Sequence, residues 1–237
     1  MKPAPKKAGQ LYGIGVGPGD PELMTLKAVR LLKECQIIAV PAAGKDRNTA
    51  YEIVKCAVPG ITAKEILELS MPMTRDHKRL ESSHEAAALK VIAELDRGQN
   101  VAFITLGDPS IYSTYLYVHT RVVARGYNAR IVPGVPSFCA AAARLNEGLT
   151  EAAQALHIIP ASYDGIEEAL ALKGTRVLMK AGKSLREIKT LIGAMQRRPS
   201  VKLVERCGMQ GERVFNHLED MDDQASYFSI MIVKDEP

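Results

Sequence analysis

Short runs of apolar residues alternate along the chain with longer segments whose apolar positions recur every three to four residues. The short runs are rich in Ile and Val and predict strands at residues 11–16, 36–41, 101–106, 129–133, 156–160, 176–180, 201–206 and 227–233. The longer segments predict helices at residues 21–35, 49–57, 76–97, 111–125, 137–146, 165–172 and 184–195. Strands that alternate with helices in this way indicate an α/β protein with substantially parallel sheets.

The pattern restarts after the helical segment that ends near residues 121–126, although no Pro/Gly/Ser-rich linker divides the chain. We therefore expect a flexible tail at residues 1–9, an amino-terminal α/β domain at residues 10–122 and a carboxyl-terminal α/β domain at residues 123–237. In the first helix, Asp20 is the expected cap, and Leu23, Leu26 and Leu31 are expected on the buried side.

Composition excludes several classes of protein. The net charge is +4 over 237 residues, and lysines at positions 2, 6 and 7 supply three of those charges, so the folded part has no basic surface typical of nucleic-acid binding. No apolar run is long enough to span a membrane, and the amino terminus lacks the apolar core of a signal peptide. The four cysteines lie far apart without a C-x-x-C pair, which favours a reduced, cytoplasmic protein.

The first candidate for chemistry is the glycine-rich run GIGVGPGDP at residues 13–21, where a predicted strand turns into a helix. Glycines let a ligand approach the backbone, and the amino end of a helix attracts anions. The dinucleotide fingerprint G-x-G-x-x-G fails because Pro18 and Asp20 stand where its last glycine is required. Asp20 would also repel a pyrophosphate, which favours a ligand with less negative charge.

Two further turns follow predicted strands, LGDPS at residues 106–110 and VPGVPS at residues 132–137. Ligands of open α/β sheets collect at such strand ends. Gly, Asp and Pro are also the usual residues of plain turns, so Asp108 can equally be a helix cap. The residues alone leave both interpretations open.

Other catalytic motifs are incomplete. The run AGKS at residues 181–184 resembles the end of a Walker A loop, but Val177 replaces the first glycine. His77 and His84 have no third metal ligand nearby and are expected to face solvent, so no metal site is predicted. The hydrolase motif G-x-S-x-G is absent from the sequence.

Together, the three turns and the later run VLMKA at residues 177–181 resemble the tetrapyrrole methylases, over roughly residues 10–234. The resemblance implies two α/β domains of the tetrapyrrole methylase type, with the cofactor S-adenosylmethionine in the cleft between them, and a homodimer. S-adenosylhomocysteine would be the product. The cofactor-binding residues that the resemblance implies are Pro18, Leu106, Gly107, Asp108, Ile111, Tyr112, Ser137, Phe138, Met179, Cys207, Gly208 and Met209.

Within the family, the runs GDPSIYST at residues 107–114 and RCGM at residues 206–209 look most like the branch that methylates C20 of precorrin-2 or its cobalt-containing counterpart. The resemblance implies a substrate with several carboxylates, bordered by Gly17 and Pro18. Arginines suit carboxylates, and the candidates are Arg47, Arg75 and Arg206, with Lys45 as a further one. No residue stands out as a catalytic base. The alternatives are methyl transfer to another position of a corrin precursor, or a non-catalytic α/β module that binds a small ligand.

Overall fold

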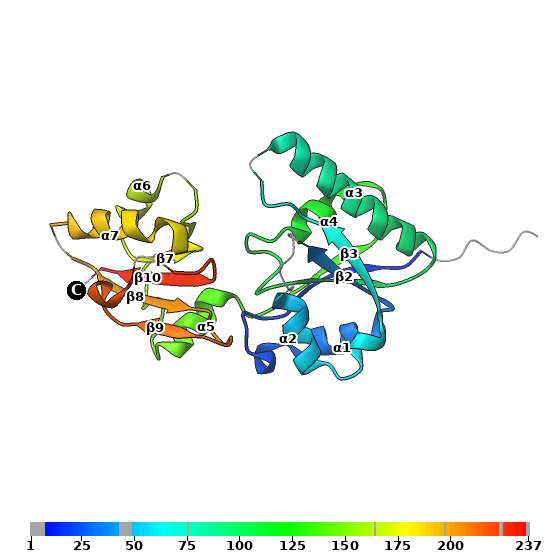
Figure 1. The fold of residues 1–237 in the computed structure, drawn as a ribbon, viewed down its shortest axis with the longest axis horizontal. Coiled ribbons are helices and arrows are strands. Elements are labelled where there is room, and N and C mark those ends of the chain that lie inside the picture. Colours follow the sequence, from blue (N-terminus) through cyan, green and yellow to red (C-terminus); the bar gives the residue numbers. More distant parts are fainter. Residues whose placement is uncertain are drawn as a thin grey trace, which may run out of the picture. The chain divides into compact units, whose positions relative to one another are not determined.

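The computed structural model describes residues 8–42, 49–74, 76–163, 165–196, 198–222 and 225–235. They form two compact units, one ending at Pro136 and the other beginning at Ser137, and each is built around its own five-stranded sheet (Figure 1). Residues 1–7 and the candidate substrate ligands Lys45, Arg47 and Arg75 lie outside the described residues.

The first unit contains an entirely parallel sheet with the strand order β3-β2-β4-β1-β5. Its strands are β1 (Leu11–Gly15), β2 (Ile37–Ala42), β3 (Glu65–Ser70), β4 (Val101–Thr105) and β5 (Ala129–Val132). Its helices are α1 (Leu26–Glu34), α2 (Thr49–Ala57), α3 (His77–Asp96) and α4 (Tyr115–Ala124), with 3-10 turns η1 (Pro21–Leu23) and η2 (Ile61–Ala63). The predicted parallel α/β arrangement is confirmed here, and β3 is an addition to the predicted strands.

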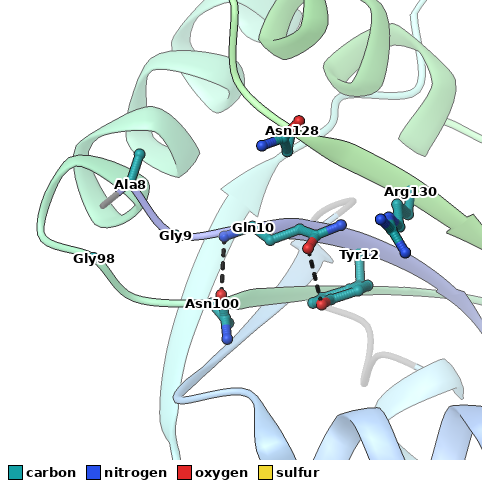
Figure 2. Close-up of a pocket in the computed structure, with 8 residues that line it drawn as sticks. All are labelled: Ala8, Gly9, Gln10, Tyr12, Gly98, Asn100, Asn128 and Arg130. Carbon is teal, nitrogen blue, oxygen red and sulfur yellow. Dashed lines mark hydrogen bonds between the residues drawn. The ribbon is translucent and has the colours of Figure 1, made fainter. Parts of the chain in front are cut away.

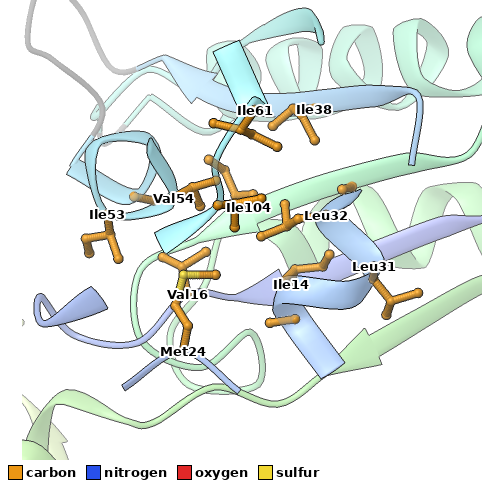
Figure 3. Close-up of a cluster of buried hydrophobic side chains, with 14 of the residues drawn as sticks. Ile14, Val16, Met24, Leu31, Leu32, Ile38, Ile53, Val54, Ile61 and Ile104 are labelled. Atoms are coloured by element: carbon orange, nitrogen blue, oxygen red, sulfur yellow. The ribbon is translucent and has the colours of Figure 1, made fainter. Parts of the chain in front are cut away.

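Helices cover both faces of this sheet, with α1 and α2 on one face and α3 and α4 on the other (Figure 1). Ile14 and Ile104 pack under α1 and α2, where Leu32 is fully buried (Figure 3). Leu11 and Phe103 point the other way, toward α3 and α4. Because each buried aliphatic or aromatic side chain contributes about 1.5–3 kcal/mol, these two layers hold the strands, and therefore the strand ends, in place.

The entry into α1 differs in detail from the prediction. Asp20 caps as expected, since its Oδ1 accepts the Glu22 N–H at 2.9 Å, but it caps η1. The helix proper is capped by Thr25, whose Oγ1 accepts the Ala28 N–H at 3.1 Å. The expectation that Leu26 is buried is wrong: it is 90% exposed, because the break after η1 rotates the helix face.

The expectation that His84 faces solvent is also wrong. This α3 residue is 5% exposed, and its ring stacks on Tyr117 of α4 with the ring centroids 4.3 Å apart. Burial and the nearby Arg121 guanidinium lower the pKa of His84, which favours the neutral ring. The histidine is therefore part of the packing between the two helices.

The second unit has a mixed sheet with the order β6-β7-β10-β8-β9. Its strands are β6 (Leu156–Pro160), β7 (Thr175–Met179), β8 (Ser200–Glu205), β9 (Arg213–Phe215) and β10 (Ser229–Lys234), and its helices are α5 (Ser137–Arg144), α6 (Ile166–Leu170) and α7 (Leu185–Gly193), with 3-10 turns η3 (Ala181–Ser184) and η4 (Leu218–Asp220). β6 and β7 are parallel, whereas β10 is antiparallel to both of its neighbours and β9 is antiparallel to β8. The expectation of substantially parallel sheets is therefore wrong for this unit.

Helices α6 and α7 cover one face of the second sheet, and α5 lies on the other (Figure 1). Leu178, Leu203 and Met231 form the layer under α6 and α7. Alternate residues of the same strands, such as Val177 and Ile232, face the opposite side.

The boundary between the units lies farther along the chain than residues 122–123, because β5 pairs with β1 and belongs to the first sheet.

At the expected flexible tail, Gly9 is already fixed: it is buried, and its N–H donates to the Leu95 carbonyl at 2.8 Å. No helix in the described part of the chain is long and apolar enough to cross a membrane.

Candidate active site

The three turns singled out in the sequence meet at one edge of the first sheet. Strands β1, β4 and β5 are adjacent and parallel, so the loops that follow Gly15, Thr105 and Val132 leave the sheet on the same side. This is the edge at which ligands of parallel α/β sheets bind. Contacts between the three loops account for their glycines and for Asp108.

Two glycines join the first loop to the second. The Gly107 N–H donates to the Gly17 carbonyl at 2.8 Å, and the Gly17 N–H donates back to the Gly107 carbonyl at 3.3 Å. Both residues have positive φ values, 79° for Gly17 and 69° for Gly107, which favour glycine. The two loops are therefore fixed to each other through backbone alone.

The third loop is held against the other two by close backbone contact. A Cβ on Gly15 would lie 2.6 Å from the Gly107 oxygen, and a Cβ on Gly134 would lie 2.3 Å from the same atom. Such distances leave no room for any side chain. The glycines of the three motifs thus pack on one another, which explains why each motif carries one.

Asp108 completes this arrangement. Its Oδ2 accepts the Gly134 N–H at 2.9 Å, and its Oδ1 accepts the N–H and the hydroxyl of Ser110 at 2.7 and 2.5 Å. The residue is 8% exposed. The sequence left open whether Asp108 binds a ligand or forms the turn. The structure shows the turn-forming role directly, because both carboxylate oxygens already have protein partners.

Beyond Asp108 the chain remains irregular before α4 begins. Ile111 is half-buried, and Tyr112 is 47% exposed with a φ of 48°, which is strained for a residue with a large side chain. Behind them the hydroxyls of Thr105 and Ser113 form a buried hydrogen bond of 2.9 Å. Strained residues of this kind concentrate at functional sites.

The second unit has a comparable edge. β7 and β8 are both antiparallel to β10, so they run in the same direction and end together at Met179 and Glu205. The residues that follow, Lys180 and Arg206, both adopt positive φ values, 60° and 53°. The Lys180 N–H donates to the carbonyl of Ser229, the first residue of β10, at 3.1 Å, and the Arg206 N–H donates to the carbonyl of Phe228, just before β10, at 2.9 Å.

The loop after β8 contains Cys207, Gly208 and Met209. The Gly208 N–H donates to the Glu212 carboxylate at 2.8 Å, and Glu212 also pairs with Arg144 of α5. The Gly208 hydrogen bond, with Arg144, lowers the pKa of Glu212 although partial burial opposes this. Cys207 is buried, so the loop presents backbone and the half-buried Met209.

Glu205 anchors the same loop from below. Glu205 is only 4% exposed. Its carboxylate accepts the Ser226 N–H at 2.6 Å and the Arg213 Nε–H at 2.6 Å. Burial raises the pKa of Glu205, but the bonds from Ser226 and Arg213 outweigh it and the net shift is downward. Glu205 is not among the site residues predicted from the sequence, where its only signal is an acidic residue at the end of an apolar strand.

The described residues expected to bind the cofactor or, in the case of Gly17 and Arg206, only the tetrapyrrole fall into two sets, each at the strand ends of its own unit. The first set follows β1 and β4 and consists of Gly17, Pro18, Leu106, Gly107, Asp108, Ile111 and Tyr112. The second set lies in α5, at the end of β7 and after β8 and consists of Ser137, Phe138, Met179, Arg206, Cys207, Gly208 and Met209. Among the described residues, no group of His, Cys, Asp and Glu could hold a metal ion.

Comparison with protein families identifies the family of the chain. Residues 10–222 match the model of the tetrapyrrole (corrin/porphyrin) methylases. The chain belongs to this family. Among curated relatives of this methylase, the probable cobalt-precorrin-2 C(20)-methyltransferase of Methanocaldococcus jannaschii is 38% identical over 97% of both chains. The cobalt-precorrin-2 C(20)-methyltransferase of Salmonella typhimurium is 32% identical over 95% of this chain and 96% of that one.

Solved structures of other tetrapyrrole methylases share the fold. The cobalt precorrin-4 methyltransferase CbiF has a TM-score of 0.74 at 21% identity and covers 95% of this chain and 94% of that one. The uroporphyrin-III-C-methyltransferase of Thermus thermophilus has a TM-score of 0.69 at 25% identity, with the same two coverages. The resemblance and the two-domain methylase fold that it implied are confirmed.

Proposed function

We propose that this methylase transfers a methyl group from S-adenosylmethionine to C20 of precorrin-2 or its cobalt-containing counterpart in cobalamin biosynthesis. The observation that carries the proposal is the 38% identity, over 97% of both chains, to a relative named for that reaction. Relatives from Salmonella typhimurium and Sinorhizobium named for C20 methylation support it at 32% and 30% identity.

The chemistry of the strand ends fits S-adenosylmethionine. This cofactor carries a positive sulfur, an adenine ring and a ribose, which call for backbone hydrogen bonds, apolar contacts and no nearby uncompensated cation. The loops after β4 and β8 offer backbone around glycines, together with Ile111 and Met209, which are half-buried. Asp108 contributes negative charge while its oxygens stay with Ser110 and Gly134. We assign the cofactor to the members of the two sets other than Gly17 and Arg206, at the strand ends of the two units.

When bound, S-adenosylmethionine supplies a methyl group that is already activated by the positive sulfur. The protein then needs neither a metal nor a covalent intermediate, and its residues have to orient the two reactants and exclude water. The interlocked glycines of the three loops suit this task because they fix the backbone without side-chain motion. We assign Gly17 and Pro18 to the border of the tetrapyrrole site, and Arg206, with Arg47 and Arg75, to its carboxylates.

The test is a reaction of the purified full-length chain with S-adenosylmethionine carrying a ¹³C-labelled methyl group. Precorrin-2 and cobalt-factor II are supplied in parallel, and a reaction without tetrapyrrole is the control. A labelled methyl at C20 in the NMR spectrum is the expected result, and the ratio of the two turnovers identifies the natural substrate. A labelled methyl at another carbon would show that the protein methylates a different position of a corrin precursor. Tight S-adenosylhomocysteine binding without product would support a ligand-binding module.

Two further properties belong to the same proposal. We assign the chain to the cytoplasm, a reducing compartment that suits its four widely separated cysteines, and to a homodimer. Sedimentation equilibrium tests the second point, since a mass near 25.8 kDa, that of one chain, would contradict it.

A further inference from the structure

A cavity of about 450 Å³ lies at the amino-terminal ends of β1, β4 and β5, the edge of the first sheet opposite the three glycine loops (Figure 2). It is lined by Ala8, Gly9, Gln10, Tyr12, Gly98, Asn100, Asn128 and Arg130. None of these residues takes part in the site assigned to the cofactor or the tetrapyrrole. The cavity therefore needs an explanation of its own.

The strand register places its polar side chains on a single face of the sheet. Tyr12 pairs with Arg130, so their side chains point to the same side. Gln10 and Asn128 lie two positions before these residues, just ahead of the two strands, and both line the cavity. Farther along β1 the same face carries Ile14, which is buried in the core under α1 and α2. The apolar covering thus ends at Tyr12, and polar groups take over.

The groups that remain available in the cavity are mainly donors. Among the described residues that line the cavity, Arg130 is the only charged one and none has a carboxylate. No described residue forms a hydrogen bond or ion pair with its guanidinium. The Gln10 Oε1 accepts the Tyr12 hydroxyl at 3.1 Å, which leaves Nε2 buried and without a partner among the described residues. In Figure 2 this amide nitrogen points along the strand toward Arg130.

We propose that this cavity binds a small oxyanion, with the Arg130 guanidinium as its counter-charge and the side-chain amides of Gln10 and Asn128 as further donors. A guanidinium binds planar carboxylate or phosphate oxygens through two parallel hydrogen bonds. An unpartnered buried amide donor is costly, and an acceptor oxygen next to Arg130 would remove that cost. The volume lies within the range of small-molecule sites.

The test uses the full-length chain with inorganic phosphate and with succinate, each titrated by calorimetry and by the rise in Tm at constant ionic strength. We expect saturable binding of at least one probe, and the stronger one tells whether the ligand is a phosphate or a carboxylate. Arg130→Gln should weaken that binding at least tenfold. Arg79→Gln, which changes an exposed arginine of α3 outside the cavity, should bind as tightly as the wild type.

A second variant separates loss of binding from loss of folding. Gln10→Glu places a carboxylate beside Arg130, so it should abolish anion binding while the Tm without anion stays at or above that of the wild type. The proposal is overturned if neither probe binds saturably up to tens of millimolar. It is equally overturned if Arg130→Gln folds and binds the anion as the wild type does, because the anion would then be bound elsewhere.

Discussion

The Asp108 carboxylate accepts the backbone N–H of Gly134 at 2.9 Å and thereby joins the loop after β4 to the loop after β5. The other oxygen of the same carboxylate holds Ser110 two residues farther on. A single side chain thus fixes the shape of one loop and its position against another. Because both loops lie at the edge assigned to the cofactor, the stability of this contact and the binding of the cofactor should depend on each other.

Replacing Asp108 with Ala should lower the free energy of unfolding by about 1.5–3 kcal/mol, since three hydrogen bonds to a charged group are lost. It should also weaken S-adenosylhomocysteine binding. Asp76→Ala is the matched control for cofactor binding, because Asp76 caps α3 through the N–H groups of Lys78 and Arg79 and is not among the residues assigned to the cofactor. Thermal melting and calorimetric titration of both variants check this. Unchanged cofactor affinity in Asp108→Ala would reduce Asp108 to a turn former.

The interior strands and most helices could be predicted because their apolar periodicity is strong. The two strands that were missed lie at sheet edges. β3 contains Glu65 and Glu68, and only Leu69 is buried along it, so it shows no continuous apolar run. β9 has just three residues. Edge strands bury little, and their sequences therefore carry little of the pattern on which such predictions depend.

Strand direction in the second unit illustrates a different limit. α7 connects β7 to β8 as a parallel crossover, but the chain from β8 through β9 to β10 contains no α-helix among the described residues and returns antiparallel. Periodicity alone contains no information on direction. In the site, the glycine turns could be identified as a motif, whereas the partners of Asp108 and Glu205 depend on residues distant in the sequence.

Two cysteines should differ sharply in reactivity. Burial raises the pKa of the Cys35 thiol to about 12, although the Lys64 ammonium opposes this, and Cys35 is 1% exposed. Cys56 on α2 is exposed. Because the thiolate is the reactive form, a thiol reagent at neutral pH should modify Cys56 and leave Cys35 untouched in the folded protein. Peptide mass spectrometry after brief labelling measures this, and equal labelling at both positions would contradict the burial of Cys35.

The second unit should lose stability in acid through Glu205. Its pKa is held below the ordinary value of 4.5, so the unfolded chain binds this proton more readily than the folded one. The stabilisation is therefore fully present above about pH 4.5 and is lost as the pH falls below that value. Glu205→Gln should cost about 1–3 kcal/mol at pH 7 and flatten the decline in acid. Glu219→Gln, at an exposed residue, is the control in the same Tm measurements across pH. If the Tm of Glu205→Gln falls in acid as steeply as that of the wild type, other carboxylates cause the acid sensitivity.

Gly17 and Gly60 provide the sharpest test of the glycine loops, because they have nearly the same backbone conformation in different surroundings. Their φ values are 79° and 80°. A Cβ on Gly60 would meet nothing within 4 Å, whereas a Cβ on Gly17 would lie 3.3 Å from the Leu23 carbonyl oxygen. Either glycine replaced by Ala should therefore lose about 1–2 kcal/mol from the left-handed conformation alone.

Only the Gly17 variant should also lose function. Gly17→Ala disturbs the pair of hydrogen bonds with Gly107, and we expect it to lower turnover by more than its loss of stability explains, with tetrapyrrole affinity reduced more than cofactor affinity. Gly17→Leu should show both effects more strongly. Gly60→Ala should keep wild-type turnover at a similarly lowered Tm. Melting curves with binding titrations of each ligand decide the matter: if Gly17→Ala binds the tetrapyrrole as tightly as Gly60→Ala does, the loop after β1 does not border the substrate.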